Sequence, residues 1–106
     1  MDREKLVEAV KNGYIEWRKH ALERMLQREI YRSEVKEALI AGEIIEVYED
    51  DKPFGSALFF YIKSKPLHVV ASFDEKKSVV YIVTAYRPNK DSFEDDFKTR
   101  KKDAKQ

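Results

Sequence analysis

The sequence predicts an α+β domain in which N-terminal helices pack on a mostly antiparallel sheet of four or five strands. Two observations carry this prediction. Apolar residues recur at helical spacing before Gly42, whereas after Gly42 they fall in short runs typical of strands. The links between those runs are only a few residues long, which favours antiparallel neighbours because a parallel crossover needs a dozen or more residues. A helical layer followed by a β-meander is therefore expected.

The first helix is expected to begin at Asp2, whose carboxylate can cap it, and to end at Asn12-Gly13. Apolar residues at helical spacing form its inward face: Leu6, Val7 and Val10. The next segment, residues 14–17, is short and aromatic. It fits either an edge strand or a packed linker.

A second helix is predicted over residues 18–28, and a third from Ser33, which can act as its N-cap, to Gly42. The second helix presents one apolar face, made of Leu22, Met25 and Leu26. The third presents a similar face, made of Val35, Ala38 and Leu39. Both faces are expected to cover the sheet.

Strands are predicted at residues 43–48, 57–62, 67–73 and 79–86. In the third of these strands every second residue is apolar: Leu67, Val69, Ala71 and Phe73. That face should be buried against the helices, which leaves His68 on the more open face of the sheet.

After the last strand, the chain from Asp91 is predicted to form a polar helix anchored by Phe93 and Phe97, which lie one turn apart. Residues 1–100 are expected to make a single domain, because 106 residues leave no room for a second one. Residues 101–106 are expected to be a disordered tail.

Composition narrows the function classes. Charged residues reach 39%, but 21 basic and 20 acidic residues nearly cancel, so no strong uniform field draws the protein to nucleic acid or to a membrane surface. The absence of cysteine excludes a disulfide framework, a thiolate nucleophile and a cysteine-based zinc site. No signal peptide or long apolar run is visible, which makes a cytoplasmic location the expectation.

One candidate site is a basic row on the second helix. His20, Arg24 and Arg28 stand at i, i+4 and i+8, one turn apart. His20 and Arg24 lie nearly opposite the apolar face, and Arg28 lies some way round toward the same side. An RNA backbone could meet such a row phosphate by phosphate. The alternative is an ordinary solvated helix face.

The second candidate is His68, because imidazole can move a proton at neutral pH. If Phe73 pairs with Val79, His68 lies opposite Thr84 at about 5.5 Å and diagonal to Tyr86 at about 8 Å. A hairpin one residue tighter would put Val83 opposite His68 and turn the Thr84 hydroxyl toward the core, which makes the first register preferable. The alternative is a sheet histidine whose ring nitrogens are satisfied by its neighbours.

Arg87 is expected at the rim of the sheet, because Pro88 forces the chain out of the strand ladder. Other chemistry has little support. Two histidines without cysteines make a poor metal site, and there is no glycine-rich phosphate loop and no nucleophile elbow. No cofactor and no metal are therefore expected.

Four runs carry a resemblance to a known family: His20–Arg28, Pro66–Val70, Tyr81–Pro88 and Phe93–Lys101. In this order they resemble a family of small prokaryotic domains of unknown function, over roughly residues 15–101 of the chain. That family is in turn similar to RelE-like and MqsR-like toxins, which are small ribonucleases of toxin-antitoxin systems. The resemblance implies a RelE-like fold and metal-independent cleavage of RNA by its own 2′-hydroxyl.

On that interpretation the catalytic residues are His68 as general base or acid, Tyr86 as a second proton or hydrogen-bond contact, and Arg24 as a phosphate clamp. Substrate-binding roles fall to His20, Arg28, Thr84 and Arg87. The partners implied are RNA and an antitoxin of the zinc-finger and helix-turn-helix type, with a homodimer as the alternative and no membrane. The competing hypothesis is a non-enzymatic protein-interaction module that uses the open sheet face.

Overall fold

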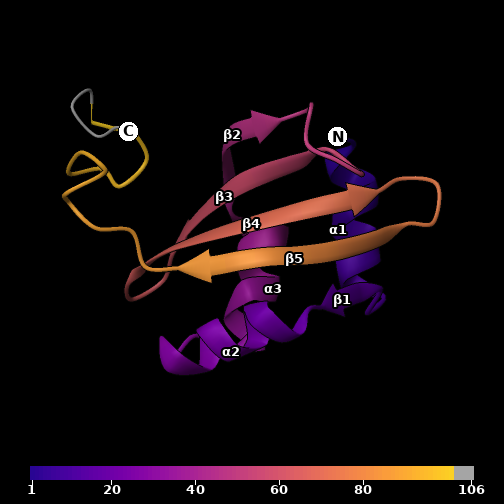
Figure 1. Ribbon diagram of the computed structural model, residues 1–106, viewed down its shortest axis with the longest axis horizontal. Coiled ribbons are helices and arrows are strands. Elements are labelled where there is room, and N and C mark those ends of the chain that lie inside the picture. Colours follow the sequence, from indigo (N-terminus) through magenta and orange to yellow (C-terminus); the bar gives the residue numbers. More distant parts are fainter. Residues whose placement is uncertain (102–106) are drawn as a thin grey trace.

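The computed structural model describes residues 1–101, and its helices and strands follow the predicted order (Figure 1). This part of the chain forms three helices and five strands: α1 (Arg3–Lys11), β1 (Ile15–Trp17), α2 (Lys19–Gln27), α3 (Arg32–Ala41), β2 (Glu43–Tyr48), β3 (Ser56–Ile62), β4 (Pro66–Asp74) and β5 (Val79–Tyr86). The predicted α+β class is confirmed.

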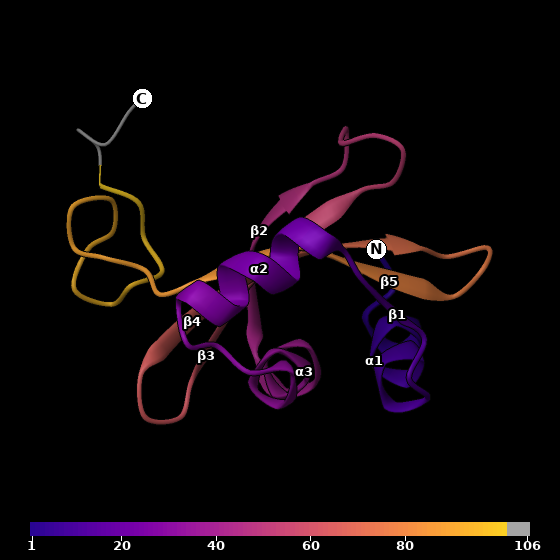
Figure 2. The same ribbon diagram turned by 60° about the horizontal axis from the view of Figure 1, so that its bottom comes forward.

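The five strands form one open, mixed sheet in the order β1-β5-β4-β3-β2. Neighbouring strands from β2 to β5 are antiparallel, as the short links predict, whereas β1 is parallel to β5. Residues 14–17 therefore supply an edge strand, which was one of the two expected alternatives. Because β1 pairs only with Val80–Ile82, the rest of the β5 edge is left to α2, which runs alongside it (Figures 1 and 2).

The core lies between the sheet and the helices α1 and α3, which cover one of its faces (Figure 2). The predicted apolar face of β4 is fully or almost fully buried there, at Leu67, Val69, Ala71 and Phe73. Asp2 caps α1 by accepting a hydrogen bond from the Lys5 amide at 3.2 Å, as predicted. Among the helices of residues 1–101 none covers the opposite face of the sheet, which we call the open face.

Two helix predictions are wrong in detail. Leu26 is 81% exposed, because Ala21 and Met25 form the buried stripe of α2 and the residue after Met25 is turned about 100° away from the core. The N-cap of α3 is Tyr31 rather than Ser33, and it makes no side-chain capping bond. The end of α3 at Gly42 is as predicted, and no larger residue fits there, since an added Cβ would clash with the Ala38 and Phe60 carbonyl oxygens.

The predicted register of β4 against β5 is also wrong. The hairpin is one residue wider than expected, with Phe73 opposite Val80, and a β-bulge between Val70 and Ala71 shifts the pairing by one more residue. As a result His68 lies opposite Tyr86, and Thr84 lies opposite Val70.

The segment after β5 does not form the predicted helix. Asn89 and Asp96 accept hydrogen bonds from backbone amides two and three residues ahead of them, and such local bonds compete with helix formation. Phe97 has a φ of 59°, in the left-handed region, and Phe93 forms an isolated bridge with Arg100. Residues 89–101, here called the C-terminal segment, thus make a compact loop at the end of the sheet where β5 ends (Figure 1).

The predicted disordered tail at 101–106 lies outside the described residues, apart from Lys101. Within residues 1–101, no helix combines the length and the apolar character needed to cross a membrane.

Candidate functional site

His68 lies on the open face, and the C-terminal segment covers it completely. Its side chain has no exposed surface, and the Phe93 ring meets it edge-on with 4.7 Å between ring centroids. The His68 Nε2 atom lies 2.6 Å from the Phe97 carbonyl oxygen, and the Nδ1 atom lies 3.3 Å from the Tyr86 hydroxyl oxygen. Because a carbonyl can only accept, Nε2 carries the proton in the neutral ring, and Nδ1 is left to accept the Tyr86 hydroxyl.

The environments of these two side chains keep both of them neutral near pH 7. Burial lowers the pKa of His68 below its ordinary value, although the hydrogen bond to the Phe97 carbonyl acts in the opposite direction. Burial raises the pKa of the Tyr86 hydroxyl. A proton acceptor, Nδ1, is therefore in contact with a proton donor, the Tyr86 hydroxyl.

A charged pair lies next to this contact. Arg100 of the C-terminal segment donates to the Glu46 carboxylate from Nε at 2.7 Å and from a terminal nitrogen at 3.2 Å. The Tyr48 hydroxyl donates to the same carboxylate. Glu46 and Tyr48 alternate along β2 and therefore share one face of the sheet, which is the face that carries His68.

The pKa values in this group are coupled through Glu46. Burial raises the pKa of the Glu46 carboxyl, but hydrogen bonds from Arg100 and Tyr48 outweigh burial and lower it below its ordinary value. Burial, together with the bond to Glu46, raises the pKa of Tyr48 to about 12. The hydrogen bond to Glu46 raises the pKa of Arg100 above its ordinary value, so the guanidinium stays charged. We call the five residues His68, Tyr86, Glu46, Tyr48 and Arg100 the His68 centre.

Sequence reasoning found two members of the His68 centre and missed Glu46, Tyr48 and Arg100. The period-two spacing of Glu46 and Tyr48 was an available signal, because it placed two polar side chains on one face of a predicted strand. Arg100 gave no such signal, because its position depends on the fold of the C-terminal segment, for which a helix was predicted.

Two other predicted site residues, Arg87 and Thr84, lie outside the His68 centre. Arg87 makes a two-pronged ion pair with Glu34 at 2.8 and 2.9 Å and also donates to the Pro66 carbonyl, so it ties α3 to the end of β5. Thr84 lies opposite Val70, two residues before Tyr86 in β5. Within residues 1–101, the hydrogen bonds of the His68 ring go to Tyr86 and Phe97 and not to Thr84 or Arg87.

The basic row lies along the β5 edge and does not converge on His68. Arg28 is closest, because its guanidinium donates to the Ala85 carbonyl at 2.8 Å, next to Tyr86 in the chain. Arg24 is exposed. The side chain of His20 is 93% exposed and lies at the other end of α2, 4.0 Å from the Glu23 carboxylate.

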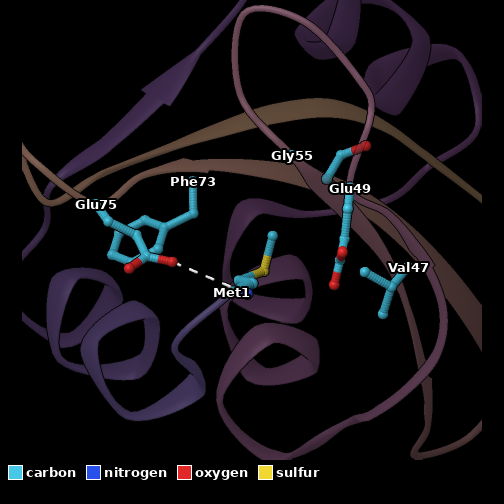
Figure 3. Close-up of a pocket in the computed structure, with 7 residues that line it drawn as sticks. Met1, Val47, Glu49, Gly55, Phe73 and Glu75 are labelled. Carbon is cyan, nitrogen blue, oxygen red and sulfur yellow. Dashed lines mark ion pairs between the residues drawn. The ribbon is translucent and has the colours of Figure 1, made fainter.

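One hollow of the surface has an acidic lining. It has a volume of about 200 Å³, lies at the opposite end of the sheet and is lined by Met1, Phe73 and two carboxylates, Glu49 and Glu75 (Figure 3). Its acidic lining makes it a poor match for a phosphate. No cluster of three or more histidine, aspartate or glutamate side chains suited to a metal ion occurs among residues 1–101.

The fold and the site together define a small α+β domain with a buried histidine–tyrosine contact beside an arginine–glutamate pair. The chain belongs to the family described as "Domain of unknown function (DUF4258)", whose model matches residues 17–87. That range contains α2 to β5, including His68 and Tyr86, whereas Arg100 lies beyond it. No match was found among curated proteins or among solved structures. The predicted family of unknown function is thus confirmed, while the link to RelE-like and MqsR-like toxins stays a prediction.

Proposed function

We propose that this domain is a RelE-like, toxin-type endoribonuclease that cleaves single-stranded RNA without a metal ion. The observation that carries the proposal is the 3.3 Å contact between the neutral His68 Nδ1 and the Tyr86 hydroxyl, with Arg100 beside it. Cleavage by the RNA's own 2′-hydroxyl needs a group that takes a proton and a positive charge near the phosphorane. The His68 centre contains both.

His68 has no exposed surface, so in this proposal it acts through Tyr86, which is only half-buried. Tyr86 takes the proton of the 2′-hydroxyl while it passes its own proton to His68 Nδ1. The 2′-oxygen forms a bond to phosphorus, the bond from phosphorus to the 5′-oxygen breaks, and the 5′-oxygen leaves with a proton from water. His68 then returns its proton to solvent through Tyr86, and a 2′,3′-cyclic phosphate remains on the RNA.

Arginine side chains would hold the phosphate. Arg100 is about half exposed while it pairs with Glu46, so one side of the guanidinium stays accessible to an anion. Arg28, anchored on the Ala85 carbonyl, approaches Tyr86 from the β5 edge and would meet the neighbouring phosphate. Arg24 is the next residue of the row in the direction of the N-terminus of α2.

A second candidate function is a non-enzymatic protein-interaction module. Two observations favour it: His68 is fully buried with both ring nitrogens partnered, and large apolar side chains are exposed on the helices, with Leu26 at 81% and Tyr31 at 71%. An antitoxin would be the expected partner under the toxin proposal, and a second copy of the chain is the alternative.

The test is incubation of the purified protein with end-labelled single-stranded RNA in EDTA, with and without ribosomes. We expect fragments that end in a 2′,3′-cyclic phosphate, growth arrest on expression, and a rate about 10²-fold or more lower for folded His68→Gln. Lys36→Gln, at an exposed position of α3 that lies outside both proposed sites, serves as the control. Intact RNA under both conditions, together with normal growth, would favour the interaction module.

A further inference from the structure

A basic pocket lies at the β5 edge of the open face, away from His68. It has a volume of about 340 Å³ and lies where the start of α2, the loop between β2 and β3, and β5 come together. Its lining is basic and aromatic, with Arg18, His20, Lys52, Phe54 and Tyr81. We call it the Tyr81 pocket.

The aromatic part of the Tyr81 pocket is a preformed stack. The rings of Phe54 and Tyr81 are nearly parallel, at 7°, with their centroids 5.7 Å apart. The Arg18 guanidinium carbon lies 5.4 Å from the centre of the Tyr81 ring. Phe54 is only half-buried, so a further flat ring can extend the stack on its exposed surface. Flat rings that stack on aromatic side chains are the general feature of nucleobases bound as single strands.

The charged part of this pocket is positive and largely unpaired. Among residues 1–101, neither Arg18 nor Lys52 has an acidic side chain within 4.0 Å, and His20 has only a 4.0 Å contact with Glu23. Glu16 pairs with Tyr81 across the strands, but it is exposed and does not line the pocket. Cations that line one pocket without direct ion-pair partners repel one another, and a bound phosphate relieves that repulsion.

The Tyr81 pocket and the His68 centre are joined by one edge of the molecule. Tyr81 and Tyr86 are five residues apart on β5, which is roughly 16 Å along a strand. The basic row of α2 follows the same edge, from His20 in the pocket to Arg28 at the Ala85 carbonyl. An extended strand laid along this edge would therefore meet the aromatic stack at one end and Tyr86 at the other.

We propose that the Tyr81 pocket binds a nucleobase and an adjacent phosphate of single-stranded RNA, as a subsite that positions the strand for the His68 centre. This inference rests on the proposed function, because it assigns a binding subsite for the substrate of the same reaction. Phe54 supplies the stacking surface, and Arg18 and Lys52 hold the phosphate. Stacking accepts every base, so the subsite fixes the path of the strand rather than its sequence.

The test measures binding separately from cleavage. In a Tyr86→Phe background, the affinity for a short fluorescent single-stranded RNA is measured by anisotropy over a range of salt concentrations. We expect Phe54→Ala to weaken binding roughly fivefold or more and Phe54→Tyr to retain it, because only the first change removes the ring. Lys52→Gln should reduce the slope of log affinity against log salt by about 0.7, whereas Lys36→Gln, on α3, should leave it unchanged.

Two competitors separate a nucleobase site from a general anion site. An oligomer of the same length without bases should bind more weakly than the RNA, and polyglutamate should displace the RNA poorly. Equal binding of the abasic oligomer, or equal displacement by polyglutamate, would overturn the inference. The subsite alone would be overturned if Phe54→Ala and Lys52→Gln, each with Tyr86 retained, cleave RNA at the parent rate and the same changes in the Tyr86→Phe background leave binding unchanged. RNA bound in the pocket but never cleaved would support the subsite and remove the proposed cleavage.

Discussion

The two ends of the open sheet face differ in how their charged groups are satisfied. At the His68 end, the C-terminal segment buries the imidazole, and Arg100 is paired with Glu46. At the Tyr81 end, the loop between β2 and β3 lines an open pocket, and Arg18 and Lys52 have no ion-pair partner among residues 1–101. The first end has the shifted pKa values that proton transfer needs, and the second has the accessible positive charge that anion binding needs.

The two ends of β5 differ in their surroundings because different segments of the chain lie against them. Tyr81 and Tyr86 both lie on β5 and on the open face, yet burial raises the pKa of Tyr86, while Tyr81 forms one wall of an open pocket. The C-terminal segment creates the contrast, since it brings Phe93 and Arg100 to one end only. Changes in that segment should therefore alter one end and spare the other.

The largest effect is expected when a charge is placed on the buried face of β4 rather than on its open face. Val69 is fully buried in the core, so Val69→Asp puts an unpaired carboxylate there and removes most of the ~5–15 kcal/mol that stabilises a domain. Val70, next in the chain, is half-buried on the open face, and Val70→Asp should cost far less. Thermal unfolding followed by circular dichroism measures both. Equal melting temperatures for the two variants would mean that the faces are assigned wrongly.

The next largest effect distinguishes the two tyrosines of β5. Tyr86→Phe removes the hydroxyl that contacts His68 and should lower RNA cleavage about 10²- to 10⁴-fold. Tyr81→Phe keeps the stacking ring and should leave the cleavage rate within about twofold. Initial rates on the same RNA, with folding checked by circular dichroism, give the comparison. A similar loss in both variants would remove the distinction between a reacting end and a binding end.

A third prediction tests the cover of the His68 end. Phe93→Ala should destabilise the protein by about 3 kcal/mol, because Phe93 is 3% exposed and touches the His68 ring. The pKa of His68 should rise toward the ordinary value, since burial is the main cause of its depression. An NMR titration of the His68 ring protons would report this shift. Phe54→Ala, at the other end, should leave the His68 titration unchanged.

A fourth prediction follows from the same depressed pKa. The folded protein binds a proton at His68 less readily than the unfolded chain does, so stability is complete above about pH 6.5 and is lost as the pH falls below it. Denaturant unfolding between pH 7.5 and 5.5 should show this decline. In His68→Phe, which cannot titrate, the decline should be reduced relative to the parent protein. Glu46 affects the stability in a lower pH range. Because its pKa is lowered in the folded protein, its contribution to stability is lost only as the pH falls below about 4.5.

Local patterns in the sequence were sufficient for most of the fold. The bounds of β2 and β5 were predicted without error, because alternation and short turns are properties of neighbouring residues. The pairing of His68 with Tyr86 was not predictable in this way, since it depends on the β-bulge at Val70/Ala71, which no single residue announces. The C-terminal segment was mistaken for a helix because Phe93 and Phe97 have helical spacing, while the side-chain bonds of Asn89 and Asp96 decide against it.

The same reasoning explains which site residues were found. His68 and Tyr86 attracted notice because their side chains have proton chemistry of their own. Glu46, Tyr48 and Arg100 gain significance only from the order of the strands and from the segment that folds over them. The arginine row was assigned to His68 because helical spacing shows which residues share a face, but not toward which part of the sheet that face is turned.

The smallest expected effect compares a paired arginine with an unpaired one. Arg100→Gln removes both bonds to Glu46 and should cost up to about 1 kcal/mol, because the pair is partly exposed and its attraction is screened. Arg18→Gln removes only a contact with the Tyr81 ring, worth about 0.5 kcal/mol at an exposed site, and it also relieves repulsion from Lys52. The two terms oppose each other, so Arg18→Gln should leave stability almost unchanged. Urea unfolding at low and high salt measures both variants, and high salt should shrink the Arg100 effect. If Arg18→Gln proved as destabilising as Arg100→Gln, Arg18 would have a structural partner, and the Tyr81 pocket would lose the unpaired charge that distinguishes it from the His68 end.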